Sequence, residues 1–411
     1  MISCVFRGPG NFRVKLALSL LSTKCVRITH IRNKNEKPGV DDSEVSLLKL
    51  IDEISNGTVI TINDTGTIVT CKPGILTGGT FAFACNGDRG IGYFLEFLLM
   101  VAPFCKNAID GTLWGVTNSK YDPSLDMIKH AWIPVYRSLI GPNAAAHIRL
   151  EVTKRGVAPG GGGEVLFCSK PSSGILPLIK IIPGKVYSLL VIIKRILSNC
   201  SLRVRGVAWT CRVSSGYGHK LLTGAKSLLN RFLSDVYITL DHRKDESAGK
   251  SPGFGITLWA ETKNDVVYSS ESMSEPENPD AVPVDAELVG KTAASRLMEQ
   301  IYQSGCVDSG GQSLALLMMA CESGRNASQL AIGTPTSYTI STLQLIRDFL
   351  GVTFHFSYQN RSAVVESTSP SDEDHPSASE KPPDKTTSCG QDLLIATCFG
   401  AGLQNIGRAI R

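Results

Sequence analysis

The chain has 411 residues, of which 42% are hydrophobic, so it is long enough for roughly two or three domains with a sizeable core. Its formal net charge of +5 permits contact with RNA without demanding it, and an aromatic share of 7% is small for a protein that relies on base stacking. Twelve cysteines without a C-x-x-C pair disfavour zinc fingers and thioredoxin-like sites, and they favour reduced thiols in the nucleus or the cytosol.

Strands and helices alternate in the first part of the chain. Apolar periodicity predicts helices over residues 14–21, 43–54 and 90–103. Short β-branched runs bounded by turn residues predict strands over 26–31, 59–62, 68–71, 113–116 and 147–152, and another strand from Val165. The recurrence of strand pairs with helices suggests repeated α+β units. No window reaches the roughly 18 unbroken apolar residues of a membrane-spanning helix, so we expect a soluble protein.

The second part begins with a segment typical of a compact inserted module. It predicts strands over 203–213, 236–240 and 256–261 with a helix over 221–233, followed by a linker over 271–283. Helices are then predicted over 292–303, 312–320 and 341–350, and strands over 352–356 and 393–399. Residues 362–388 are rich in Ser, Pro and charged residues, and we expect them to be disordered because they cannot bury enough apolar surface.

The most distinctive motif is Arg155 followed by the four glycines Gly160, Gly161, Gly162 and Gly163. Glycine is costly in a packed strand, so such a run marks a backbone that turns sharply or approaches another group closely. Two interpretations remain open: a tight connection before the next strand, and an anion cradle of free N–H groups beside Arg155.

A second glycine-containing segment, Gly249-Lys250-Ser251, does not fit a phosphate loop. Lys244 stands where that signature needs its first glycine, and Pro252 follows where a helix should begin. We therefore favour a solvated loop over residues 241–255, ahead of a loop that contacts RNA or a partner.

No catalytic centre emerges from motifs alone. The seven histidines are dispersed without an H-x-x-x-H pair that could bind zinc. The carboxylate pairs Asp41-Asp42 and Asp122…Asp126 are more typical of helix starts and turns than of catalysis.

Several separated motifs together resemble the RNA 3′-terminal phosphate cyclase family over nearly the whole chain. The glycine loop is similar to the family's R-G-x-x-P-x-G-G-G segment, and further matches occur at Arg32 with 37–39, at 73–79, at 305–308 and at 312–316. The segments 159–165, 249–255 and 305–308 look most like the eukaryotic cyclase-like branch of the family, which works in small-subunit ribosome assembly.

The resemblance implies an α+β fold in which a large domain of three repeated α+β units is interrupted by a smaller inserted α/β domain. On this basis we expect the large domain to comprise residues 1–185 and 286–411, and the inserted domain residues 186–285. The apolar segment 186–202 departs from the family. It is either an extra helix or strand, or translated intron sequence.

The resemblance also bears on the chemistry. The cyclases use a histidine that becomes adenylylated by ATP and passes AMP to an RNA 3′-phosphate, and Tyr338 stands at that position here. A phenol with a pKa of about 10 is almost wholly protonated at neutral pH. Asp41, Asp42 and Glu44 would repel phosphates, and the enzymes' Asp-Gln pair is Gly311-Gln312. We therefore expect no catalytic residue, no metal and no cofactor.

What remains is a predicted anion- or RNA-binding pocket, made of Arg13, Arg155, Gly160, Gly161, Gly162, Gly163 and Gln312. The resemblance implies a non-catalytic factor in the nucleolus of the nucleus, for pre-rRNA processing and 18S rRNA maturation. Its expected partners are an assembly GTPase and the pre-ribosomal particle with small nucleolar RNA and pre-rRNA, with no role for a membrane.

Two alternatives stay open at this point. One is an active RNA-processing enzyme, either a residual cyclase that uses Tyr338 or an endonuclease that cuts pre-rRNA, although no acidic cluster of obvious metal-binding spacing supports a nuclease. The other is a duplicated copy that has lost its function, against which the intact pattern of core residues argues.

Overall fold

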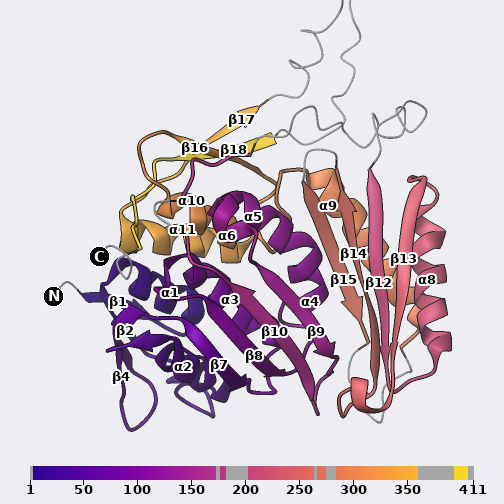
Figure 1. Ribbon diagram of the computed structural model, residues 1–411, viewed down its shortest axis with the longest axis horizontal. Helices are drawn as coiled ribbons and strands as arrows, with labels where there is room; N and C mark the ends of the chain where they lie inside the picture. Colours follow the sequence, from indigo (N-terminus) through magenta and orange to yellow (C-terminus); the bar gives the residue numbers. More distant parts are fainter. Residues whose placement is uncertain are drawn as a thin grey trace, which may run out of the picture.

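The computed structural model describes residues 3–172, 176–181, 202–262, 266–274, 284–359 and 393–405. Within these ranges the chain forms four sheets of four strands each, with helices packed against them (Figure 1). The predicted apolar segment 186–202, apart from Leu202, and the predicted disordered loop 362–388 lie outside the described residues. Most of the predicted linker 271–283 also lies outside them, and its first three residues are the end of a strand rather than linker.

The first sheet has the strand order β1-β2-β5-β4, in which β1 and β2 are parallel and the other pairs are antiparallel. Helix α2 begins with a capping box, in which Asp41 and Glu44 exchange side-chain and backbone hydrogen bonds, so Asp41 has the predicted helix-start role. The elements are β1 (Ser3–Arg7), α1 (Phe12–Ser22), β2 (Cys25–Thr29), α2 (Asp42–Ile54), β4 (Val59–Ile62) and β5 (Val69–Lys72), with a small pair of β3 (Ser55–Asn56) and β6 (Ile75–Leu76).

The second sheet has the order β7-β8-β10-β9. Its strands are β7 (Gly79–Ala84), β8 (Ile109–Gly115), β9 (Arg149–Lys154) and β10 (Gly163–Ser169). Its helices are α3 (Ile91–Val101), α4 (Leu125–Met127), a π-helical turn (Ile128–Trp132), α5 (Ile133–Ile140) and α6 (Pro142–Ala145). The helical stretch from 125 to 145 is absent from our sequence prediction, because short helices joined by a π-turn lack one sustained period.

The third sheet combines distant parts of the chain in the order β11-β16-β18-β17. Its elements are β11 (Lys180–Ile181), α10 (Gln312–Cys321), β16 (Ser328–Ile332), α11 (Ser337–Leu350), β17 (His355–Gln359) and β18 (Leu393–Cys398). In each of the three sheets, the first two strands in chain order are parallel, and the last strand lies antiparallel between the second and the third.

The fourth sheet has the order β13-β12-β14-β15 and lies with α8 at one end of the molecule (Figure 1). Its elements are β12 (Arg203–Cys211), α8 (Ser215–Leu229), β13 (Asp235–Arg243), β14 (Gly253–Glu261), β15 (Val267–Met273) and α9 (Ala286–Gln303). Helix α9 packs on α8 and on β14 and β15. A Cβ on Gly224 would lie 2.1 Å from the Glu287 carbonyl oxygen, so glycine allows the two helices to approach backbone to backbone.

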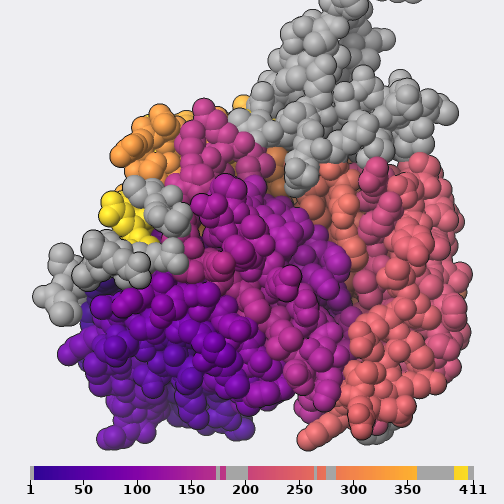
Figure 2. Space-filling view, in the orientation of Figure 1, coloured from indigo at the N-terminus to yellow at the C-terminus, as the bar shows by residue number. Residues whose placement is uncertain are grey.

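Buried helices hold these sheets together. Every residue of α3 and of α10 is buried, and α11 packs on α1 although the two are far apart in sequence. Figure 2 shows the fourth-sheet part (salmon) lying directly against the surface of the second-sheet part (purple). No helix among the described residues combines the length and the apolar character needed to cross a membrane.

Candidate functional site

A cleft of about 670 Å³ opens between the helices α1, α2 and α3, the segment 120–132, β15 and α11. Residues from eight separated stretches of the chain line it, so no single sequence motif identifies it. The lining residues are Pro9, Gly10, Asn11, Phe12, Arg13, Arg32, Glu44, Arg89, Tyr93, Glu96, Lys120, Tyr121, Asp122, Pro123, Met127, Trp132, Glu271, Gly310 and Tyr338.

Tyr338 lies in the first turn of α11, which Thr336 caps by accepting a hydrogen bond from the backbone N–H of Thr339. The Tyr338 hydroxyl donates a hydrogen bond of 2.8 Å to Oε1 of Glu96 and accepts one of 3.2 Å from Nε of Arg13. The phenol therefore has a fixed donor role and a fixed acceptor role between two charged side chains.

This environment keeps Tyr338 protonated. Burial raises the pKa of the phenol well above its usual value, the negative charge of Glu96 raises it further, and the positive charge of Arg13 only partly opposes this. Burial also raises the pKa of Glu96, whose side chain is 2% exposed. A phenolate nucleophile is thus disfavoured at neutral pH.

The arginines of the cleft are already paired with carboxylates. Arg13 lies 2.5 Å from Glu96, and Arg89 binds Asp122 through both Nε and Nη2. Both guanidinium groups also contact the ring of Tyr93, whose centroid is 4.6 Å from Cζ of Arg13 and 4.4 Å from Cζ of Arg89.

Arg32 is paired in the same way. It forms a bidentate pair with Glu44, at 2.8 and 2.9 Å, and a second contact of 2.5 Å with Asp41. Asp41 and Glu44, which the sequence predicts to repel phosphates, therefore neutralise the arginine that faces the cleft. Four basic and four acidic side chains line the cleft, and their formal charges cancel.

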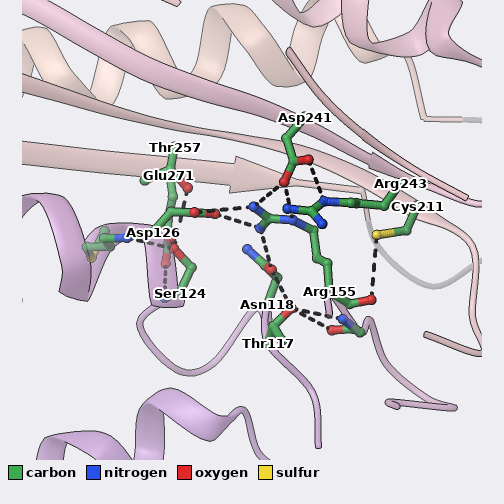
Figure 3. Close-up of polar contacts among 12 residues, drawn as sticks. Thr117, Asn118, Ser124, Asp126, Arg155, Cys211, Asp241, Arg243, Thr257 and Glu271 are labelled. Carbon is green, nitrogen blue, oxygen red and sulfur yellow. Dashed lines mark hydrogen bonds and ion pairs between the residues drawn. The ribbon is translucent and has the colours of Figure 1, made fainter. Parts of the chain in front are cut away.

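The second polar cluster surrounds Arg155 and lies outside the cleft lining (Figure 3). Its guanidinium group binds Asp126 at 2.6 Å and Asp241 at 2.9 Å, and it donates a 3.0 Å hydrogen bond to Asn118. Its side chain is 3% exposed. Although burial opposes ionisation, the charge of Arg155 keeps the pKa of the Asp126 carboxyl below its usual value. The cluster joins the second sheet to β13.

The glycine loop packs against the segment 249–251. The Gly160 N–H donates to Ser251 Oγ at 2.8 Å, and the Lys250 N–H donates to the Gly161 carbonyl at 3.0 Å. A Cβ on Gly163 would lie 2.4 Å from Cγ2 of Thr117. These contacts support the tight-connection interpretation. They also correct the prediction of a solvated loop over 241–255, whose Ser251 is buried.

The structure distributes the predicted site residues over three places. Arg13 and Tyr338 meet in the cleft. Gln312 is not among the residues that line the cleft; it is 1% exposed and accepts a hydrogen bond from Thr339 of α11. Arg155 lies in the second polar cluster, and Gly160–Gly163 pack against the segment 249–251. Arg13 is bound to Glu96, whereas Arg155 is bound to Asp126 and Asp241, so the two arginines do not form one pocket.

Two carboxylates of the cleft, Glu96 and Glu271, were not predicted from the sequence as site residues. Glu96 was detectable, because it is the single charged residue of the apolar helix α3, and a buried charge implies a partner. Glu271 carried no comparable signal. Burial raises its pKa to about 7. Among the described residues, no group of three His, Cys, Asp or Glu side chains is arranged to hold a metal ion.

Comparison with known proteins assigns the chain to a protein family. The family model for RNA 3′-terminal phosphate cyclase matches residues 4–356, so this chain belongs to the RNA 3′-terminal phosphate cyclase family. It is similar to the RNA 3′-terminal phosphate cyclase-like protein of Bos taurus, with 36% identity over 414 aligned residues that cover 100% of this chain and 98% of the relative.

Two further relatives support the same assignment. The probable RNA 3′-terminal phosphate cyclase-like protein of Dictyostelium discoideum is 38% identical over 375 residues, which cover 88% of this chain and 95% of the relative. The rRNA processing protein rcl1 of Schizosaccharomyces pombe is 35% identical over 320 residues, which cover 77% of this chain and 82% of the relative.

Proposed function

We propose that this chain is a ribosome biogenesis factor that acts in pre-rRNA processing without carrying out ATP-dependent RNA cyclisation. The role in rRNA processing is supported by the similarity to the Schizosaccharomyces pombe protein named for it. The loss of cyclisation is supported by one observation above all: the Tyr338 hydroxyl is held as a protonated donor to Glu96.

The charges of the cleft support the same conclusion. A nucleoside triphosphate brings several negative charges, and it would need guanidinium groups that are free to bind phosphate. Arg13, Arg32 and Arg89 are each bound to a carboxylate within 3 Å. Binding ATP would require breaking these pairs in a partly buried cleft, which is costly because uncompensated charges would be left behind.

The test uses the purified chain with radiolabelled ATP and a 3′-phosphorylated RNA, and an active cyclase of the family as positive control. We expect no covalent label on the protein and no cyclic RNA end. A label that disappears in Tyr338→Phe, or any 2′,3′-cyclic end, would overturn the proposal. The same assay with Tyr338→His asks whether the histidine alone restores the reaction. We expect that it does not, because the arginines remain paired.

We further propose that the chain acts in the nucleolus, in maturation of 18S rRNA, and that it binds an assembly GTPase within the particle that contains small nucleolar RNA and pre-rRNA. Cells depleted of the similar Schizosaccharomyces pombe protein should recover 18S rRNA when this chain is expressed. If expression of this chain left the 18S rRNA and pre-rRNA of the depleted cells unchanged, the role in processing would be refuted. If affinity purification of this chain recovered no GTPase, the proposed GTPase partner would be refuted, but the role in processing would not.

A second candidate, cleavage of pre-rRNA, is favoured by a single observation. Glu271 lines the cleft, and its pKa of about 7 suits a general acid or base at neutral pH. Incubation of purified protein with a pre-rRNA spacer, with and without Mg²⁺, tests this directly. Cleavage by the wild-type chain that is lost in Glu271→Gln would favour an enzyme over our main proposal.

We also propose that the first three sheets are repeats of one α+β unit and that the fourth sheet belongs to an inserted domain. The proposal is supported by the identical strand order and pairing sense of the three sheets, and by the different order of the fourth. Because α9 packs on α8 and β14, we place α9 in the inserted domain, which moves its C-terminal boundary beyond the predicted residue 285.

A further inference from the structure

The outer face of the first sheet carries charge of one sign. Strand residues alternate between its two faces, and Val26, Ile28, Val69 and Cys71 on the inner face are almost fully buried. Arg7, Arg27 and Lys72 point the other way and are exposed. None of the strands β1, β2, β4 and β5 contains an acidic residue.

The strand register places these three cations on one line. Arg7 pairs with Thr29, Arg27 pairs with Val5 and Thr70, and Lys72 continues β5 two residues beyond Thr70. Each cation is therefore displaced by two residues from the next, on neighbouring strands and on the same face. Such diagonal neighbours lie ~7–8 Å apart. We call Arg7, Arg27 and Lys72 the basic stripe.

In the part of the chain that the structure describes, no carboxylate neutralises the basic stripe. No ion pair among the described residues involves Arg7, Arg27 or Lys72, and the flanking loop residues Glu36 and Asp64 form none with them. This contrasts with the arginines of the cleft, which are all paired. It also contrasts with the second sheet, whose strands carry Asp110, Glu151 and Glu164.

We propose that the basic stripe binds the phosphodiester backbone of a single-stranded RNA. The stripe offers unpaired cations at a spacing of the same order as neighbouring phosphates in an extended strand. The threonines Thr61 and Thr70 beside it provide hydroxyl donors. The outer face has no aromatic residue on which bases could stack, so the contact is independent of base sequence. The choice of RNA over other polyanions rests on the proposed function in pre-rRNA processing.

Salt dependence of binding is the measurement that isolates the stripe. Each phosphate contact to a single strand contributes about −0.7 to the slope of log K against log salt concentration, so three contacts contribute about −2. Between 50 and 200 mM salt, that part of the affinity falls by about 20-fold. We expect fluorescence anisotropy with a labelled RNA of mixed sequence to show this component in the wild-type chain, and to show its loss in the triple variant Arg7→Gln, Arg27→Gln, Lys72→Gln.

A matched control removes the same charge from elsewhere. Arg149, Lys220 and Arg231 are exposed on the second sheet, on α8 and after α8, and the triple variant Arg149→Gln, Lys220→Gln, Arg231→Gln should keep the wild-type slope. An equal loss of slope in both triple variants would show that net charge alone governs binding. An unchanged slope in the stripe variant would also overturn the proposal.

The remaining outcomes separate the stripe from the proposed function. If the wild-type chain bound polyglutamate but no RNA, and the stripe variant bound neither, the stripe would be a site for an acidic protein. This result would overturn the RNA assignment. If the stripe variant loses RNA binding in vitro and still restores 18S rRNA in depleted cells, the stripe binds RNA but processing does not need it. If RNA binding fails while the wild-type chain restores 18S rRNA, the proposed function stands and the stripe proposal falls.

Discussion

Replacement of Arg155 by methionine tests whether the residue next to the glycine loop is structural or binds an anion. The change removes the guanidinium group and keeps most of the aliphatic volume. It leaves Asp126 without its cation in a site where its side chain is 7% exposed. Removal of one partner from a buried ion pair costs about 3–5 kcal/mol. Asp241, which is 24% exposed, keeps Arg243 at 2.6 Å, so we expect a loss near the lower limit, about 3 kcal/mol.

The assay is urea unfolding followed by circular dichroism at pH 7 and at pH 5. In the wild-type chain the pKa of Asp126 is lower in the folded state than in the unfolded state, so its pairing stabilises the protein above the unfolded pKa and is lost as pH falls through the folded pKa. In the variant, the unpaired carboxyl can take up a proton more easily. We therefore expect the deficit in unfolding free energy to shrink at pH 5.

Arg243→Met is the matched control, because it removes a more exposed cation from the same Asp241. We expect it to cost less than about 1 kcal/mol. The reasoning would be refuted if Arg155→Met cost no more than this control, or if its deficit were the same at both pH values. Loss of RNA binding with unchanged stability would instead restore the anion-cradle interpretation of Arg155.

Three further predictions concern single positions. Tyr338→Phe leaves an oxygen of the buried Glu96 without its donor and should lower the free energy of unfolding in urea by about 1–3 kcal/mol. Tyr358→Phe, at a side chain that is 74% exposed, should cost almost nothing, and equal costs for the two variants would contradict the hydrogen bond to Glu96. Gly163→Ala should lower the free energy of unfolding by about 1–3 kcal/mol, because the added Cβ would lie 2.4 Å from Cγ2 of Thr117. Gly10→Ala, whose Cβ would have no atom within 4 Å, should leave stability unchanged, and equal stability of both variants and the wild type would refute the close packing of the glycine loop. Burial raises the pKa of Glu271 to about 7, so wild-type stability falls as pH rises from the unfolded pKa to 7. Glu271→Gln should therefore be roughly 3 kcal/mol more stable than wild type at pH 8 and no different at pH 4, and a stability difference independent of pH would refute the raised pKa.

Local pattern was sufficient for most of the elements. The amphipathic stretch that became α2 and the alternating run that became β12 were predictable because their period and their length agree. The strand β16 was not predictable, because its sequence Ser-Gln-Leu-Ala-Ile contains a single β-branched residue. The broken helices after residue 124 were not predictable either, since each is too short to show a period and is specified by its neighbours in the fold.

The candidate site was less accessible to sequence reasoning, for a physical reason. A motif shows which residue types stand close in the chain, but charge pairing depends on residues that the fold brings in from a distance. Arg155 beside four glycines resembles a phosphate site until Asp241, 86 residues away, is seen to neutralise it. Tyr338 could be assigned to the nucleophile position by family resemblance, but its donor role toward Glu96 required the structure.

The contact between Arg13 and Tyr338 has a consequence for the order in which the protein can form. It spans 325 residues, and closing so long a loop costs about 2 kcal/mol more than closing one ten times shorter. During synthesis, Arg13 and Glu96 emerge long before α11 exists, so the phenol cannot contact them until most of the chain has been made. The cleft is therefore among the last parts of the molecule to be completed. A partner that recognises the closed cleft would consequently distinguish a chain that contains α11 from a nascent or truncated chain that lacks it.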